Sequence, residues 1–412
     1  MLARLCTGLF CGAMISIAAS AGDWTQWRGP NHNNVAEAGQ GVPTEWSDSK
    51  NVIWKADVPG RGHASPIITG NMIVLCSADE QSKTQTVVAF DRTSGKQLWL
   101  TAISQGGFPP AHAKNTHASA TAATDGTHVF ATFCHHEKIE AVALDLKGNI
   151  VWRKDVGRFR PKVYEYGYAA SPTLYKGLLI VSGDCDTVAW LKALNTADGS
   201  VAWTQERQLM LNWSSPIVAN IAGRDQLLLS GTNKIASYDP ATGTPLWSTP
   251  CLTMATCGTC VWEDDLVFAS GGYPDSQTAA VQADGSGVKW TNKVKCYEQS
   301  MLVHNGYLYA FADSGVAYCW NAKTGEEMWK QRLKGPVSSS PLLVGDTIFA
   351  TNEAGITWVF KANPQKYEQV AQNQLGDSGF ASMAAADGQL FIRTAEGDGP
   401  GRKETLYCIG EK

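Results

Sequence analysis

The sequence predicts an all-β fold, an eight-bladed β-propeller built of four-stranded blades. Two observations predict it: a tryptophan recurs at intervals of 39 to 53 residues, and a second apolar strand occurs in eight copies. A repeat of this length is typical of propellers and solenoids, whose units must pack on their neighbours to bury their apolar faces. A third observation predicts closure into a ring, because the first and last copies of the repeat are incomplete in complementary ways.

The recurring tryptophan usually follows a turn that contains Asp or Asn and then Gly. Asp and Asn can hydrogen-bond their own backbone two residues on, and Gly accepts a positive φ angle, so the phrase has the chemistry of a turn. An indole buries a large apolar area and carries a polar N–H at its edge. We therefore expect the whole series to pack between neighbouring blades: Trp54, Trp99, Trp152, Trp203, Trp247, Trp290 and Trp329.

Each repeat can be divided into four short strands. In the first complete copy, the inner strand follows Ser65-Pro66, the second strand begins at Met72, and the fourth ends at Trp99. Alternating apolar residues between clusters of Gly, Asn and Asp indicate strands joined by tight turns. The second strand fixes the alignment, and its copies begin near Met72, His128, Leu178, Leu227, Leu266, Tyr307, Thr347 and Leu390.

The two ends of the chain complete one blade. The last set of strands, residues 382–409, has no fourth strand after it, and the strand at residues 51–54 has no set before it. Joining them closes the ring and removes exposed strand edges. The propeller is therefore predicted over residues 51–412, with an N-terminal extension at 22–50. In the outer-strand series, Val370 stands where an eighth tryptophan is expected.

The first 21 residues have the pattern of a signal peptide. Arg4 precedes an apolar run, and Ala19-Ser20-Ala21 forms a cleavage site. The run is too short for a comfortable membrane span, and no second long apolar stretch follows. Cys11 lies inside the run and not at its end. We therefore expect a soluble exported protein, periplasmic or extracellular, and neither a lipoprotein nor a membrane-spanning protein.

Charge and cysteine content narrow the function classes. Charged residues make up 17% of the chain, the net charge is −4, and no basic stripe occurs, so nucleic acid is not an expected partner. Nine cysteines follow the signal peptide, and an odd number leaves at least one free thiol. Cys257 and Cys260 have the spacing of a redox pair or half a zinc site. A strand follows them where a redox pair would open a helix, which favours a structural disulfide or buried thiols.

The predicted channel mouth carries a ring of varied residues. Two positions before each Ser-Pro-like phrase the chain has His63, His117, Ala169, Trp213, Cys257, Glu298, Ser338 and Phe380. A concave site with aromatic walls and a few polar groups is typical of ligand binding. The predicted binding residues are His63, His117, Tyr168, Trp213 and Glu298, with no catalytic or metal-ligating residue predicted. The alternative is a water-filled funnel whose residues vary freely.

Two lengthened loops join an outer strand to the next inner strand. They lie near residues 105–114 and 158–168, and both should overhang the channel mouth. Binding residues often lie on such loops, although a solvated loop without function would have the same sequence pattern.

The phrase that ends in tryptophan resembles the pyrroloquinoline-quinone (PQQ) repeat. Such repeats occur in quinoprotein alcohol dehydrogenases and in non-enzymatic assembly lipoproteins of the BamB type. The stretch from Asp23 to Pro30, together with Glu45-Trp46 and Trp54-Lys55, resembles the opening of exported PQQ-like propellers of planctomycete type. The resemblance covers residue 23 to the C-terminus and implies a propeller, a scaffold that hosts many functions.

Two functions are consistent with the resemblance. The favoured one is a non-enzymatic, exported binding or scaffold propeller whose partner is a protein or a cell-envelope polymer. The alternative is a small oxidoreductase with PQQ and Ca²⁺ in the funnel. The resemblance to quinoprotein dehydrogenases implies that a PQQ enzyme of this kind would hold the cofactor with a disulfide between adjacent cysteines and would use an Asp as base. This sequence has no Cys-Cys pair, no Asp in the ring and no Cys-x-x-Cys-His haem motif, so no cofactor is expected.

Overall fold

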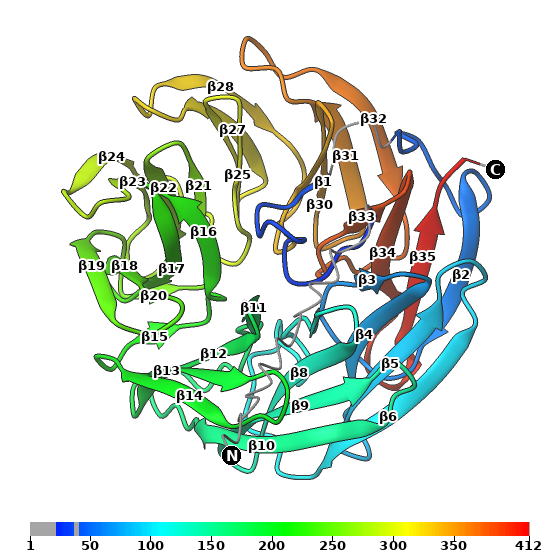
Figure 1. Cartoon of the computed structure of the whole chain (residues 1–412). Coiled ribbons are helices and arrows are strands. Elements are labelled where there is room, and N and C mark those ends of the chain that lie inside the picture. The colour runs from blue at the N-terminus through cyan, green and yellow to red at the C-terminus, as the bar shows by residue number, and fades with distance from the viewer. Residues whose placement is uncertain (1–21, 37–40, 412) are drawn as a thin grey trace, which may run out of the picture.

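The computed structural model describes residues 22–36 and 41–411, and the predicted signal peptide lies outside them. Eight four-stranded antiparallel blades surround a central axis, which confirms the predicted propeller (Figure 1). A 3₁₀ turn at Gly399–Gly401 is the one helical element of the described residues, and none of their helices is long and apolar enough to cross a membrane.

The blades follow one another along the chain, each running from an inner to an outer strand. Blade 1 contains β3 (Ile67–Thr69), β4 (Met72–Asp79), β5 (Thr84–Asp91) and β6 (Gln97–Gln105). Blade 2 contains β7 (Ala123–Thr124), β8 (His128–His135), β9 (Lys138–Asp145) and β10 (Ile150–Arg158). Blade 3 contains β11 (Thr173–Tyr175), β12 (Leu178–Asp184), β13 (Ala189–Asn195) and β14 (Val201–Glu206). Blade 4 contains β16 (Ile217–Ile221), β17 (Arg224–Gly231), β18 (Lys234–Tyr238) and β19 (Pro245–Pro250).

The second half of the ring repeats the same order. Blade 5 contains β21 (Val261–Glu263), β22 (Leu266–Gly271), β23 (Gln277–Gln282) and β24 (Val288–Asn292). Blade 6 contains β25 (Leu302–His304), β26 (Tyr307–Ala312), β27 (Val316–Asn321) and β28 (Glu327–Arg332). Blade 7 contains β29 (Leu342–Val344), β30 (Thr347–Thr351), β31 (Ile356–Lys361) and β32 (Gln369–Gln374). A short parallel pair, β15 (Leu211–Asn212) and β20 (Ala255–Thr256), bridges the loops before blades 4 and 5.

Blade 8 is made from both ends of the chain, as predicted. Its three inner strands are β33 (Ala384–Ala386), β34 (Gln389–Glu396) and β35 (Lys403–Ile409), and its outer strand is β2 (Val52–Val58). The antiparallel register places Lys55 opposite Tyr407. Arg393 joins this blade to blade 1, because its buried guanidinium donates to Glu404 Oε2 and to the Cys76 carbonyl, each at 2.8 Å.

The seven tryptophans pack against the following blade, as predicted, and six of them also donate a hydrogen bond to it. The Trp54 indole N–H donates to the Arg92 carbonyl at 2.8 Å, in the turn between the third and fourth strands of blade 1. Trp99, Trp152, Trp203, Trp290 and Trp329 bond the corresponding segment of the following blade in the same way. Trp247 differs, because its N–H donates to the Gln226 side chain of its own blade.

The missing tryptophan at Val370 follows from the closure of the ring. Val370 lies in β32, the outer strand of blade 7, and the next blade is blade 8. In blade 8 the third and fourth strands belong to opposite ends of the chain, so no turn joins them. An indole at position 370 would lack the turn carbonyl that the other blades supply.

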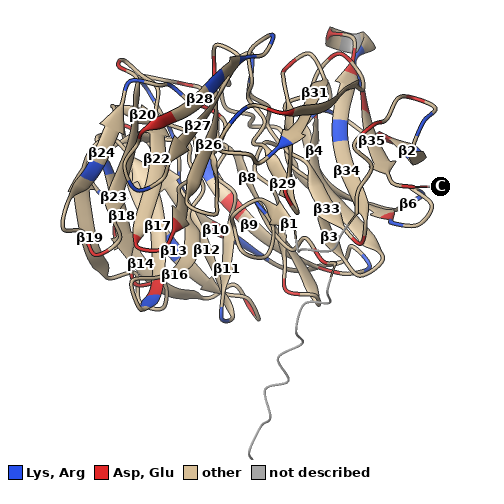
Figure 2. Ribbon diagram, turned by 90° about the horizontal axis from the view of Figure 1, so that it is seen from above, with Lys and Arg blue, Asp and Glu red and all other residues tan. Residues whose placement is uncertain are grey.

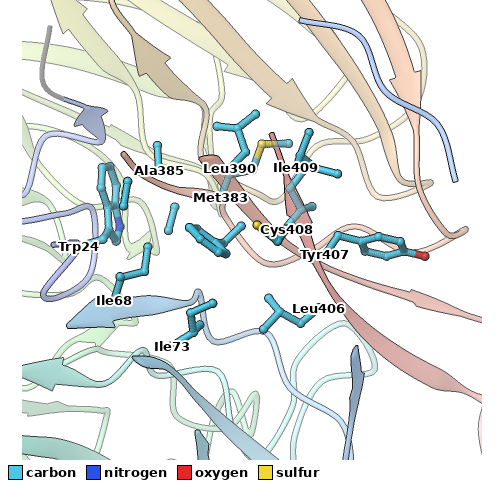
Figure 3. Close-up of a cluster of buried hydrophobic side chains, with 14 of the residues drawn as sticks. Trp24, Ile68, Ile73, Met383, Ala385, Leu390, Leu406, Tyr407, Cys408 and Ile409 are labelled. Atoms are coloured by element: carbon cyan, nitrogen blue, oxygen red, sulfur yellow. The ribbon is translucent and has the colours of Figure 1, made fainter. Parts of the chain in front are cut away.

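The N-terminal extension crosses one end of the channel (Figure 1). The backbone of Trp24 pairs with that of Ile68 in blade 1. The carbonyl of Thr25 accepts a hydrogen bond from the backbone N–H of Thr124 in blade 2. Side chains of the extension bond blades 3, 5, 6 and 7, and β1 (Val35–Ala36) pairs in parallel with β29. Figure 3 shows the buried Trp24 indole beside Ile68 and Ala385. The extension is therefore a plug that ties most of the ring together.

The charged residues are interspersed over the blades. In the view of Figure 2, segments of Lys and Arg and segments of Asp and Glu are scattered along the ribbons.

Candidate functional site

A cavity of about 400 Å³ lies in the central channel, and we call it the funnel. Trp27 of the N-terminal plug lines it, and the Trp27 indole N–H donates to Thr259 Oγ1 at 2.9 Å. The two lengthened loops also contribute, as predicted: His112 and Lys114 come from the first, and Tyr164 and Tyr166 from the second. The plug thus forms the floor of the funnel, and the loops border its mouth.

A ring of hydroxyl groups surrounds the funnel. The backbone N–H of a Ser or Thr in one blade donates to the hydroxyl of the equivalent residue in the next, at 2.8 to 3.0 Å in six of the eight junctions. Four of these hydroxyls line the cavity and have no acceptor of their own among residues 22–36 and 41–411: Ser171, Ser215, Ser340 and Ser382. Because each hydroxyl accepts a backbone bond, its proton remains available to a channel occupant.

One wall of the funnel is aromatic. Tyr166 stacks on Trp213 with centroids 5.8 Å apart and an interplanar angle of 28°. Tyr164 contacts both Tyr166 and Tyr273. The Trp213 indole N–H donates to the Gly167 carbonyl at 2.9 Å, which fixes the ring plane. The second lengthened loop is thereby held against blade 4, with flat aromatic surface toward the cavity.

His63 and Phe380 form a second flat surface. Their rings are stacked, with centroids 4.5 Å apart and an angle of 6°. Burial lowers the pKa of His63 well below its ordinary value, and the charges of Arg61, Arg393 and Arg402 lower it further. The imidazole is therefore neutral at physiological pH. Its Nε2 atom is buried and has no hydrogen-bond partner within the described chain.

The third wall carries the charged groups. The Ser338 hydroxyl lies within hydrogen-bond distance of a Glu298 oxygen and, at 2.7 Å, of Glu353 Oε1, so one proton serves two carboxylates. Lys114 Nζ donates to Glu353 Oε1 at 2.7 Å. Burial raises the pKa of Glu298, and the nearby acidic groups raise it further, against the Ser338 bond and the Lys114 charge. Glu298 has no other hydrogen-bond partner among the described residues.

The cysteines of residues 22–36 and 41–411 form no disulfide with one another. All nine of the described cysteines are free thiols, and burial raises the pKa of Cys257, which lines the funnel, and of Cys260. Both thiols are therefore protonated at neutral pH and poor nucleophiles. Among residues 22–36 and 41–411, no three His, Cys, Asp or Glu side chains gather as a potential metal site.

Three of the five predicted binding residues line the funnel, namely His63, Trp213 and Glu298. His117 does not, because it stacks on Phe108 and lies beside a much smaller cavity. Tyr168 also faces that smaller cavity, where its buried hydroxyl donates to the Ser182 carbonyl at 3.1 Å.

The place of His117 has a clear cause. The hydroxyl that continues the ring in blade 2 belongs to Thr121, so the equivalent lining residue is Ser119 and not His117. The spacing in the sequence indicates the correct alignment. Thr121 lies seven positions before the start of β8 at His128, as Ser65 lies seven positions before the start of β4 at Met72.

Trp27 is the main functional residue that the sequence reasoning missed. It lies in the extension, outside every repeat, so alignment of the repeats gives it no position. The cluster of Trp24, Trp27 and Arg28 directly after the predicted signal peptide was the available clue, since exposed tryptophans are rare in a solvated tail.

Comparison with known proteins agrees with the fold. The PQQ_2 family model, described as outer membrane protein assembly factor BamB, matches residues 31–160, 83–310 and 298–405. No curated protein sequence matches the chain.

Solved structures with the same architecture include a BamB protein and two dehydrogenases. BamB from Moraxella catarrhalis is 13% identical with a TM-score of 0.62, covering 86% of this chain and 99% of its own. A europium-containing methanol dehydrogenase is 12% identical with a TM-score of 0.71, covering 94% and 98%. Quinohemoprotein alcohol dehydrogenase from Comamonas testosteroni is 12% identical with a TM-score of 0.67, covering 97% and 82%.

At these identities the solved structures establish the fold alone. The family model spans nearly the whole propeller. The chain therefore belongs to the PQQ_2 family of β-propellers, whose model is described as outer membrane protein assembly factor BamB.

Proposed function

We propose that this protein is a non-enzymatic, exported binding propeller that holds a ligand in the funnel and presents its loop face to the cell envelope. The observation that carries the proposal is the funnel itself. A volume of about 400 Å³, aromatic walls and a few directed polar groups are typical of a binding site. The export signal read in the sequence and the BamB family membership support an envelope role.

The funnel does not suit PQQ, the cofactor that the fold suggests. PQQ is a tricarboxylate, and such an anion requires surplus positive charge. None of the described arginines lines the funnel, and its two lysines are paired with acids, Lys114 with Glu353 and Lys295 with Asp313 at 3.3 Å. Glu298 adds an acidic group to the same wall. The residues present therefore disfavour PQQ.

A reconstitution experiment separates binding from catalysis. The mature chain is mixed with PQQ and Ca²⁺, the excess is removed, and bound quinone absorbance and dye-linked alcohol oxidation are measured. We expect neither to exceed the level of the Trp213→Ala variant. Stoichiometric quinone with oxidation that depends on Trp213 would replace this proposal by the enzymatic alternative.

A sedimentation experiment tests the envelope role. Purified protein is incubated with an envelope fraction of the producing organism, before and after protease treatment of that fraction. We expect wild-type protein to cosediment and a Tyr166→Ala/Trp213→Ala variant to remain in the supernatant. Loss of binding after protease treatment would indicate a protein partner, and its persistence a polymer. Equal sedimentation of wild type and variant would contradict a role for the funnel.

A further inference from the structure

The polar groups of the funnel identify the chemistry of its ligand. Ser171, Ser215, Ser340 and Ser382 line the channel, their oxygens accept backbone N–H bonds, and their protons have no acceptor among the described residues and are free to bond a ligand. A ligand at this level must therefore offer several acceptor oxygens, spread over the width of the channel. A single carbonyl or a single carboxylate would satisfy only part of the ring.

The carboxylate of Glu298 favours a ligand that also donates hydrogen bonds. Glu298 accepts a bond from Ser338 and, among the described residues, nothing else, so its carboxylate has room for a further donor. Hydroxyl groups both donate and accept hydrogen bonds, so a polyhydroxylated ligand matches the serine ring and the carboxylate together.

The aromatic surfaces give the ligand its shape. Trp213 with Tyr166, and His63 with Phe380, are flat stacked pairs, and the Trp27 indole lies at the floor. Such surfaces bury the C–H faces of a ring whose hydroxyls point outward in its own plane. The fixed indole plane, held by the bond from Trp213 to Gly167, means that little order has to be created on binding.

The charge of the funnel selects an uncharged ligand. Both lining lysines are paired with acids, and among the described residues Glu298 is the lining carboxyl group without a salt bridge. A carboxylated or phosphorylated ligand would face repulsion from Glu298, and neither lining lysine is unpaired to offset it.

From these groups we propose that the funnel binds an uncharged saccharide, the terminal one or two rings of a glycan. Trp213 packs against the sugar face, and the serine ring and Glu298 bond its hydroxyls. The proposal rests on the proposed function as a binding propeller and names the class of its ligand.

Calorimetric titration of the mature chain tests the proposal. The neutral probes are cellobiose, maltose and N,N′-diacetylchitobiose, and the contrasting probes are glucuronic acid and adenosine. We expect saturable binding of at least one neutral disaccharide, weakened by about tenfold or more in Trp213→Ala, equivalent to about 1.4 kcal/mol. Trp213→Phe retains a flat ring and should restore part of the affinity. Val163→Ala, in the same loop and 66% exposed, is the matched control and should bind as wild type does.

The outcomes separate the two proposals. Binding of no neutral disaccharide overturns the saccharide proposal. If glucuronic acid or adenosine binds instead and Trp213→Ala abolishes it, the funnel is a binding site for another class, and the proposed function stands. Disaccharide binding unchanged in Trp213→Ala would place the ligand elsewhere and overturn the assignment to the funnel. A thermal melt of each variant shows whether it is folded before its affinity is compared.

Discussion

The indole of Trp54 lies against the backbone of Gly95, a residue of the neighbouring blade. A Cβ atom at Gly95, where φ is +71°, would approach the indole to 2.5 Å. The same relation joins Trp99 to Gly148 and Trp203 to Gly243. Glycine is therefore required in the turn for two reasons, the positive φ and the indole above it. Gly95 and Trp99 belong to one sequence motif but contact different blades: Gly95 contacts Trp54 of blade 8, and Trp99 contacts Gly148 of blade 2.

Loss of one indole should destabilise the ring strongly. Trp203 is 9% exposed, and its N–H bonds the Pro240 carbonyl of the next blade. Trp203→Ala is expected to lower the free energy of unfolding by about 3–5 kcal/mol through cavity formation. Val201→Ala, on the same strand but 57% exposed, is the control and should change it little. Denaturant unfolding measures both, and equal values for the two variants would contradict the packing role.

The buried pair between Arg393 and Glu404 should be essential to the closing blade. Both side chains are almost inaccessible, at 1% and 2% exposure. Arg393→Met leaves Glu404 buried with Arg402 as its remaining partner and removes the bonds to blade 1. We expect a loss of about 3–5 kcal/mol in the free energy of unfolding. Arg332→Met, on an exposed position of β28, serves as control. A loss no larger than that of the control would show that the pair contributes little.

Glu298 should make the stability of the protein depend on pH. Its pKa is raised in the folded state, chiefly by burial, so the ionised form is less favourable there than in the unfolded chain. The folded state favours protonated Glu298. Its contribution to the free energy of unfolding is therefore full below the ordinary carboxyl pKa of about 4.5 and is lost as pH rises through the pKa of the folded state. Glu298→Gln should therefore melt above wild type at neutral pH, and the difference should shrink in acid. Melting curves across that range test the sign, and a lower melting temperature for Glu298→Gln at neutral pH would contradict it.

His63 should act in the opposite direction. Its pKa is well below 6.5 in the folded state, by burial first and by the three neighbouring arginines second. The unfolded chain takes up the proton as pH falls below about 6.5, so wild-type stability should fall there. His63→Gln has no proton to take up and should lose less stability between neutral and mildly acidic pH. Parallel curves for the two proteins over that interval would count against a buried neutral imidazole.

The sequence predicted the parts of the fold that repeat. The strand starts at Met72, His128 and Thr347 agree with the structure, because a period-two apolar pattern between turns has a single interpretation once eight copies are aligned. The closure of the ring by residues 51–54 could also be predicted from the sequence. The incomplete blade at the C-terminus and the unpaired strand at the N-terminus leave no exposed edge only if they combine into one blade.

The site was less accessible because it depends on what does not repeat. His63, Trp213 and Glu298 reach the funnel because they occupy a repeated position, whereas Trp27 reaches it through the path of the plug. That path is set by contacts such as Arg28 with the Met301 carbonyl, 273 positions apart in sequence. Such long-range contacts leave no local pattern.

The shared use of the N-terminal region makes the funnel dependent on the whole chain. A chain that stops before β35 leaves the ring open, and β2 and β34 then present unpaired edges. During synthesis β2 stays unpaired until β35 has been made. Incomplete chains are thus exposed to aggregation or degradation through these edges, and only a full-length chain has a closed funnel.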